Sequence, residues 1–294
     1  MIKVSQLFWG KARPEYRSEP QTHPLIAHSL DVAAVVVLLR RAGERELSGQ
    51  TLGFLVALHD IGKFSRPFQA MAPDHWPTAA LGHLPASGVP AGPKHDALGY
   101  HMLRRPLAAT LDRVLPPRIE GRRAWNDGGR SALLRGLTGH HGRPPASLNL
   151  EPGPVVLCRN CLDAAEEFVV TMERIFAPPP VTLPADPQAL ARLGWRLAGL
   201  TTLADWVASR QAWFPYVSPE AVVDPADYLW NHAMTRAAGA LSAAGLTPAR
   251  SSVFTGIRGL FPRIAHRVAA NRGVGESLFR HSASVFETAT ATAL

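Results

Sequence analysis

The sequence has few of the features that mark secreted or membrane proteins. Cysteine occurs only at positions 158 and 161 of the 294 residues, which excludes a disulfide-stapled secreted scaffold and is compatible with a reducing cytosol. The N-terminus becomes polar and proline-bearing before an apolar region of signal length forms, and no stretch reaches the roughly 18 uninterrupted apolar residues of a membrane span. We therefore expect a cytoplasmic protein that does not act at a membrane.

Lysine is also scarce, although the chain is basic. The 31 Lys and Arg residues oppose 23 Asp and Glu for a formal net charge of +8, and only Lys3, Lys11, Lys63 and Lys94 are lysines. An excess of arginine favours a polyanionic partner, but it could equally reflect a GC-rich genome. With 46% hydrophobic residues the chain can bury a core, so we expect a globular protein.

The two cysteines form a single C-x-x-C motif at Cys158 and Cys161. The second pair of thiols that a four-cysteine zinc site needs is missing. The segment that follows, residues 164–168, has a helical pattern. The motif therefore favours an ordinary helix turn over a zinc or redox site, and the sequence leaves these interpretations open.

Apolar residues recur at helical spacing between loops rich in Pro and Gly, which predicts a mainly α-helical chain. The expected helices are His23–Arg41, Leu52–Ile61, His95–Leu107, Arg130–Thr138, Cys158–Phe176, Pro187–Arg210 and Ala226–Ala244. Loops are expected at Met71–Pro93 and Pro144–Pro154, and a stiff connector at Pro178–Pro187.

A polar pair closes one of the apolar helices. His59 and Asp60 follow the run LGFLVAL, at a place where a core helix would normally stay apolar. A buried His–Asp pair costs several kcal/mol unless it is partnered or binds a metal. An isolated His-Asp dipeptide is more often structural than functional, so its significance depends on the other polar residues at helix ends.

Those residues supply a larger set of imidazoles and carboxylates. With His59 and Asp60, the set comprises His28, His95, His140, His141 and Asp205. Any one histidine could be a hydrogen-bonded core or capping residue, but the combination is typical of sites for first-row divalent metals. Five histidines and two aspartates exceed the needs of one ion and predict two metals about 3.5–4 Å apart. Iron, manganese, nickel or cobalt fit the set better than magnesium, which prefers oxygen ligands.

Five segments carry a family resemblance. HSLDVA, HDIGKFSRPFQ, KHDALGY, GHHGRPP and LADWVASRQAWFPY resemble, in order and separation, the HD nuclease domain of the type I CRISPR-associated nuclease-helicase, in the HD phosphohydrolase superfamily. The resemblance covers roughly Leu7–Tyr216. It implies an all-α HD-domain helical bundle over residues 1–216, followed by a basic accessory helical extension or linker over residues 217–294.

The resemblance also assigns roles to the polar set. His28, His59, Asp60 and Asp205 match the primary ligand pattern of the superfamily. His95, His140 and His141 match the second-metal ligands of the family, and Asp60 would bridge the two ions. Asp60 and Lys63 are the expected catalytic residues. Lys63 could offset charge on a transferring phosphate or orient the attacking water, or it could simply pair with a neighbouring carboxylate.

Arginines cluster in two blocks. Nine lie between Arg104 and Arg143 and lead into the His140–His141 pair, which would place a cationic path for nucleic acid beside the metals, although these arginines could merely solvate a loop face. The candidate nucleic-acid contacts are Arg118, Arg122, Arg123, Arg130 and Arg143. A second block, Arg250–Arg280, contains one acid, Glu276, and is available for DNA or a partner.

The implied function is hydrolysis of single-stranded DNA in type I CRISPR interference, an antiviral defence, by a metal-activated water. The polarity of cutting is open, and so is the choice between endonuclease and exonuclease action. The resemblance implies a guide-RNA surveillance complex and a helicase as partners. The helicase would have to be outside this chain, because the chain has no G-x-x-x-x-G-K-[ST] loop. The chain would be either a separate subunit or a fragment of a longer polypeptide. The alternatives are a nucleotide or cyclic-nucleotide phosphohydrolase with a compact pocket, and a non-catalytic adaptor.

Overall fold

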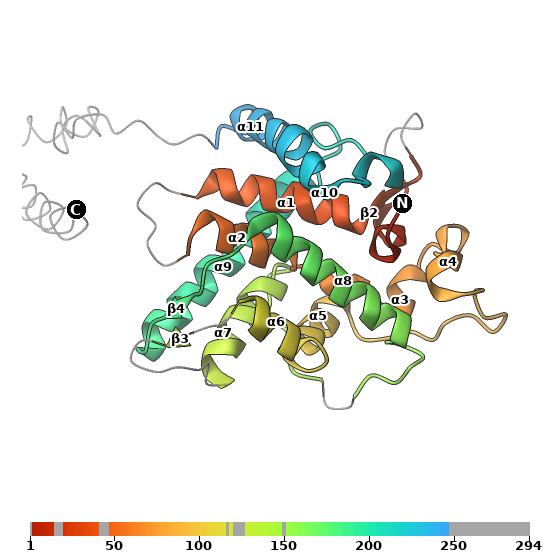
Figure 1. Cartoon of the computed structure of the whole chain (residues 1–294), viewed down its shortest axis with the longest axis horizontal. Helices are drawn as coiled ribbons and strands as arrows, with labels where there is room; N and C mark the ends of the chain where they lie inside the picture. The colour runs from red at the N-terminus through yellow and green to blue at the C-terminus, as the bar shows by residue number, and fades with distance from the viewer. Residues whose placement is uncertain are drawn as a thin grey trace, which may run out of the picture. The chain divides into compact units, whose positions relative to one another are not determined.

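The computed structural model describes residues 2–14, 20–40, 47–115, 118–119, 127–148 and 151–246. Residues 1–247 form one compact unit, and its described part is a bundle of helices, which confirms the predicted fold class (Figure 1). The helices are α1 (Leu25–Leu39), α2 (Gly49–Ala57), α3 (Arg66–Gln69), α4 (Thr78–Leu81), α5 (His95–Arg104), α6 (Ala108–Val114), α7 (Asp127–Thr138), α8 (Arg159–Phe176), α9 (Pro187–Ala208), α10 (Pro225–Asp227) and α11 (Met234–Ala243).

Short segments connect these helices. The 3-10 turns are η1 (Val4–Leu7), η2 (Ile61–Lys63), η3 (Pro73–His75) and η4 (Pro219–Val222), and η5 (Tyr228–Ala233) is π-helical. Strand β1 (Trp9–Ala12) pairs antiparallel with β2 (Thr22–Pro24), and β3 (Arg118–Ile119) pairs parallel with β4 (Thr182–Leu183). Among the described helices, none has the length and hydropathy that a membrane crossing requires.

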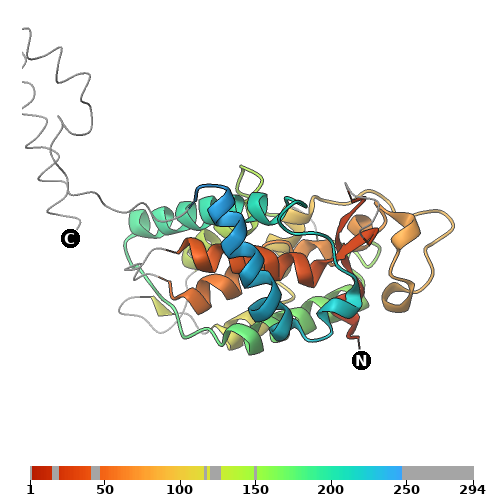
Figure 2. The ribbon, with the colours of Figure 1, turned by 90° about the horizontal axis from the view of Figure 1, so that it is seen from above.

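Helix α1 forms the centre of the bundle. It packs against α2, α9 and α11, and α11 lies beside α1 in Figure 1 and crosses in front of it in Figure 2. All residues from Leu25 to Val36 are buried, as expected of a helix that is apolar on all sides. His28 and Asp31 are the ionisable groups in this stretch, so each needs a polar partner inside the core.

The predicted helix Leu52–Ile61 ends earlier than expected. Helix α2 stops at Ala57, so that His59 and Asp60 lie on the turn between α2 and η2. Gly62 explains the tight geometry, because a Cβ there would lie 1.9 Å from the carbonyl oxygen of His95. Only glycine lets η2 approach the start of α5 this closely, and that approach brings Asp60 beside His95.

Two other predicted helices differ in detail. His23 lies in β2, and α1 begins only at Leu25. The helix expected at Ala226–Ala244 is divided into α10, the π-helical η5 and α11.

The region beyond residue 216 begins inside the same compact unit. Segments η5 and α11 pack against α1, and the hydroxyl of Tyr228 donates a hydrogen bond to Asp31 Oδ1 at 3.0 Å. The predicted domain boundary after Tyr216 stays a prediction. The second arginine block, Arg250–Arg280, lies outside the described residues.

Candidate metal centre

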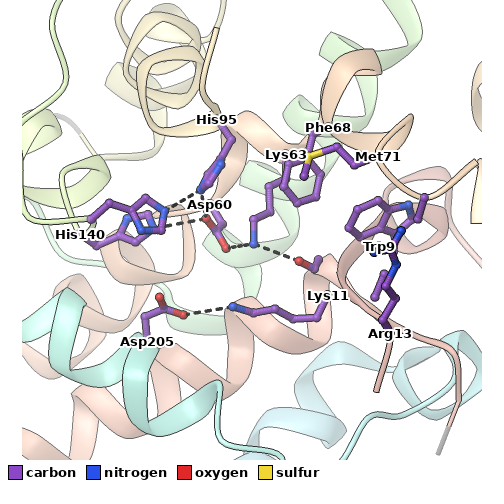
Figure 3. A pocket seen from close by; sticks show the side chains of 14 residues that line it. Trp9, Lys11, Arg13, Asp60, Lys63, Phe68, Met71, His95, His140 and Asp205 are labelled. Carbon is purple, nitrogen blue, oxygen red and sulfur yellow. Dashed lines mark hydrogen bonds and ion pairs between the residues drawn. The ribbon is translucent and has the colours of Figure 1, made fainter. Parts of the chain in front are cut away.

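All seven predicted metal ligands converge on one end of the bundle. Helix α1 carries His28, the turn after α2 carries His59 and Asp60, and α5 begins with His95. The turn after α7 provides His140 and His141, and the last part of α9 provides Asp205. Figure 3 shows Asp60, His95, His140 and Asp205 around one cavity.

The seven residues form two adjacent groups that could each hold a metal ion. One group is Asp60, His95, His140 and His141, and the other is His28, His59 and Asp205. Within each group, one ligand atom per residue lies within 4.8 Å of all the others. The partition matches the two ligand sets that the resemblance implied, with Asp60 now grouped with the second set.

Asp60 stands between the two groups. Its Oδ1 lies 3.3 Å from His95 Nε2 and 3.5 Å from His140 Nε2. Its Oδ2 lies 3.4 Å from His28 Nε2 and 3.3 Å from His59 Nε2. Each oxygen of one carboxylate therefore faces a different group, which is the arrangement that a bridging ligand needs.

Several of these buried atoms make no hydrogen bond with any described residue: His28 Nε2, His59 Nε2, Asp60 Oδ1, and both ring nitrogens of His140. A buried polar atom without a partner costs about 1–3 kcal/mol, and the fold concentrates four such side chains at one point. Coordination of a cation would satisfy their lone pairs, so the donor set fits bound metal ions.

The protonation states also suit metal binding. Burial, together with the charge of Lys11, lowers the pKa of His28 to about 4. Burial and the neighbouring His140 and His95 lower the pKa of His141 to about 4. Both rings are therefore neutral near pH 7. His59 Nδ1 lies 2.9 Å from the carbonyl oxygen of Val56, which makes Nδ1 the donor and turns Nε2 toward Asp60.

Both carboxylates are ionised. Burial alone would raise the pKa of Asp60, but Lys63 and His59 outweigh it and hold this pKa well below its usual range. Burial likewise opposes ionisation of Asp205, but its contact with His28 and the charge of Lys11 hold that pKa well below its usual range. Metal ions would therefore meet two anionic and five imidazole ligands.

Lys63 forms an ion pair with a neighbouring carboxylate, which was one of the two roles predicted for it. Its ammonium group lies 2.5 Å from Asp60 Oδ2 and donates to the Gly10 carbonyl at 3.0 Å. It also lies 5.1 Å from the centre of the Phe68 ring. The group still lines the cavity (Figure 3).

Sequence reasoning missed a second lysine at the site. Lys11, on β1, lies 3.7 Å from Asp205 Oδ1 and donates to Ser209 Oγ at 2.9 Å. Ser209 in turn donates to Asp205 Oδ1 at 2.9 Å. The scarcity of lysine was the available signal, because two of the four lysines in the chain serve this one site.

The cavity at the centre has a volume of about 360 Å³, and a neighbouring cavity has a volume of about 380 Å³. Both are lined by Phe68, Met71, His95 and His141. The first is bounded on its far side by Trp9, Lys11 and Arg13, whereas the second is bounded by residues 91–96.

The arginines proposed to contact nucleic acid are more dispersed than the seven predicted metal ligands. Arg122 and Arg123 lie outside the described residues, and Arg118 lies in β3. Arg130 forms an ion pair with Asp112 near the start of α7, about 12 Å along the helix from the end that leads to the histidine pair. Arg143 is exposed just beyond that pair. Their contact with nucleic acid stays a prediction.

Comparisons with known proteins point to one family. The family model described as "Cas3, HD domain" matches residues 9–214. The chain is 26% identical over 238 residues to the CRISPR-associated endonuclease/helicase Cas3 of Escherichia coli (strain K12), covering 69% of this chain and 25% of that protein. It is 29% identical over 215 residues to the protein of the same name from Thermus thermophilus, covering 66% of this chain and 22% of that protein.

Solved structures agree with this match. The crystal structure of the Thermus thermophilus cas3 HD domain in the presence of Ni²⁺ superposes with a TM-score of 0.53 at 25% identity, covering 83% of this chain and 92% of that one. A crystal structure of a CRISPR-associated protein shares the fold, with a TM-score of 0.66 at 24% identity over 89% of this chain and 29% of that one. The chain matches about a quarter of the length of its curated relatives.

Proposed function

This chain belongs to the family of Cas3 HD domains, and on this premise we propose that it hydrolyses the phosphodiester bonds of single-stranded DNA with two transition-metal ions. The observation that carries the proposal is the position of Asp60, whose two oxygens face two separate groups of imidazole and carboxylate ligands. Two ions that share a carboxylate suit the attack of water on a phosphodiester.

The chain's own residues have distinct roles in this proposal. His28, His59 and Asp205 would hold one ion, and His95, His140 and His141 the other, with Asp60 shared between them. Bound ions would supply the Lewis acidity that activates water and neutralises charge on the scissile phosphate.

Lys63 keeps Asp60 ionised and presents an ammonium group to the cavity, where it can offset the charge of a phosphate. Lys11, together with the contact from His28, keeps Asp205 ionised, and Lys11 also lines the cavity. With five nitrogen and two carboxylate ligands, Fe, Mn, Ni or Co suits the site better than Mg.

The shape of the cavity supports a polymeric substrate. Each of the two cavities is near the lower end of the roughly 300–1,000 Å³ that small-ligand pockets occupy, and His95 and His141 line both of them. A phosphohydrolase for single nucleotides would need one compact pocket. Two neighbouring pockets with three cations, Lys11, Arg13 and Lys63, in the first can hold successive nucleotides of an unpaired strand.

The relatives suggest the partners. Both curated relatives are named endonuclease/helicase proteins, and this sequence contains no G-x-x-x-x-G-K-[ST] phosphate loop. We therefore propose that a helicase, separate or in the remainder of a longer chain, delivers the strand in the cytoplasm after a guide-RNA complex has opened its target in CRISPR interference.

The test is cleavage of circular single-stranded DNA by the purified chain across a series of divalent metals, with metal analysis of the same preparation. We expect cleavage with Mn, Co, Ni or Fe and bound metal approaching two ions per chain. Circular substrate also separates endonuclease from exonuclease action. Hydrolysis of cyclic nucleotides with intact circular DNA would support the small-nucleotide alternative, and inactivity with every metal would support the adaptor alternative.

A further inference from the structure

The C-x-x-C motif lies outside the metal centre, at the start of α8. Cys158 is the N-cap residue, and Cys161 lies one turn later in the helix. The two sulfur atoms are 2.7 Å apart, and the backbone N–H of Cys161 donates to Cys158 Sγ at 3.3 Å. A displacement of less than about 1 Å would bring the sulfurs to the bonding distance of about 2.05 Å.

The two thiols differ in environment. Cys158 is partly exposed, whereas Cys161 is fully buried. The hydrogen bond from Cys161, the backbone amide at the helix start and the charge of Arg66 lower the pKa of Cys158 to about 6. The same contact and burial raise the pKa of Cys161. One accessible, ionisable thiol beside one buried thiol is the asymmetry of a nucleophile and its resolving partner.

The charge of Arg66 acts to lower the pKa of both thiols. Its backbone N–H donates to the Val156 carbonyl at 3.0 Å, which ties α3 to the segment before Cys158. Its guanidinium carbon lies 5.8 Å from the centre of the Trp76 ring, and its Nε makes no hydrogen bond with any described residue. The charge of the guanidinium can therefore help to stabilise a thiolate at Cys158.

A zinc site does not fit the same residues. Within the described ranges, the groups of His, Cys, Asp and Glu that could hold a metal contain only the seven residues of the metal centre. Two thiols without further ligands fall short of the four that structural zinc requires.

We propose that Cys158 and Cys161 are a reactive dithiol that forms an intramolecular disulfide by exchange with a low-molecular-weight disulfide, RSSR. The Cys158 thiolate attacks one sulfur of RSSR, the RS–SR bond breaks, and RS⁻ leaves. Cys161 then loses its proton to solvent and attacks Cys158 Sγ, which releases the second RS⁻. Two electrons pass from the protein to RSSR, both RS⁻ ions take up protons, and excess thiol reverses the reaction.

The experiment uses the full chain in chelator, so that metal-catalysed air oxidation is absent. The chain is equilibrated in glutathione buffers of increasing oxidised fraction, quenched in acid, alkylated and weighed intact. We expect the mass of the oxidised wild type to decrease by two hydrogens, and we expect neither cysteine to be alkylated. Cys161→Ser should accumulate a mixed disulfide with one glutathione, and Cys158→Ser should react at least about tenfold more slowly than Cys161→Ser.

Two controls keep the outcome decisive. Because Cys161 is buried, Cys161→Ala provides a second variant without a polar atom in the core, and thermal unfolding of each variant checks its fold. The proposal is overturned if the wild type stays reduced in fully oxidised glutathione, or if it stops at a stable mixed disulfide. It is also overturned if Cys158→Ser reacts as fast as the Cys161 variants.

Discussion

The ammonium group of Lys63 lies 2.5 Å from Asp60 Oδ2, and both side chains are buried. The two carboxylate oxygens of Asp60 also face different groups of histidines, Oδ2 toward His28 and Oδ1 toward His95. One short ion pair therefore holds in place the carboxylate that joins both halves of the candidate metal centre.

Loss of this ion pair should destabilise the chain. Lys63→Met removes the only described ammonium partner of a buried carboxylate, and breaking a buried pair from one side costs about 3–5 kcal/mol. We expect that decrease in the free energy of unfolding, measured by urea titration in chelator. The matched control is Lys94→Met, which removes an exposed lysine and should change stability by less than about 0.5 kcal/mol. Equal losses in both variants would contradict the prediction.

Asp60→Asn should disrupt both metal groups at once. The amide keeps the size of the side chain but removes the anion that faces both groups. We expect metal binding to fall below one ion per chain and DNA cleavage to fall by more than about a hundredfold. Asp74→Asn, at an exposed aspartate of η3, is the control and should keep wild-type metal content and rate. Retention of two ions by Asp60→Asn would refute the bridging role.

His28 should make stability depend on pH. Its pKa is about 4 in the folded chain, against the ordinary value of 6.5, so between these values only the unfolded chain binds the proton. The free energy of unfolding of the metal-free chain should therefore fall as pH decreases from 6.5 to 4, by up to about 3 kcal/mol from this residue.

The measurement is urea unfolding in chelator across that pH range. His28→Gln cannot titrate, so its stability should vary less with pH than that of the wild type. Parallel pH profiles for the two proteins would show that His28 is not the source of the dependence.

Blocking the second cavity should affect long substrates selectively. Ala91 is exposed and lines this cavity but not the metal cavity. Ala91→Trp should fill space that the proposed DNA strand would occupy and lower kcat/KM for an oligonucleotide at least about tenfold. Hydrolysis of bis(p-nitrophenyl) phosphate, which needs only the metal cavity, should stay unchanged.

The matched control is Ala243→Trp, at an exposed alanine of α11, which should leave both activities intact. If Ala91→Trp lowers both activities in proportion, the tryptophan has disturbed the metal centre. If it lowers neither, the strand does not use the second cavity.

The sequence predicted the helical class and the ligand set because both leave local signals. The helix expected at Cys158–Phe176 is α8, Arg159–Phe176, and the one expected at Pro187–Arg210 is α9, Pro187–Ala208. His28, His59 and Asp60 stand in or beside the apolar helices α1 and α2, where an ionisable group is conspicuous. Gly62 and Cys158 also left a local signal in the sequence, because each stands at the end of a predicted helix.

The tertiary structure alone decided how these residues combine. Lys11 contacts Asp205 from strand β1, close to the N-terminus. No periodicity in the sequence links two positions that are this far apart. The division of the ligands around Asp60 depends on how α1, α5, α7 and α9 pack, because side-chain distances of 3–4 Å follow from helix positions rather than from residue order. The chemical groups of the site can therefore be inferred from the sequence, whereas their pairing results from packing between distant segments.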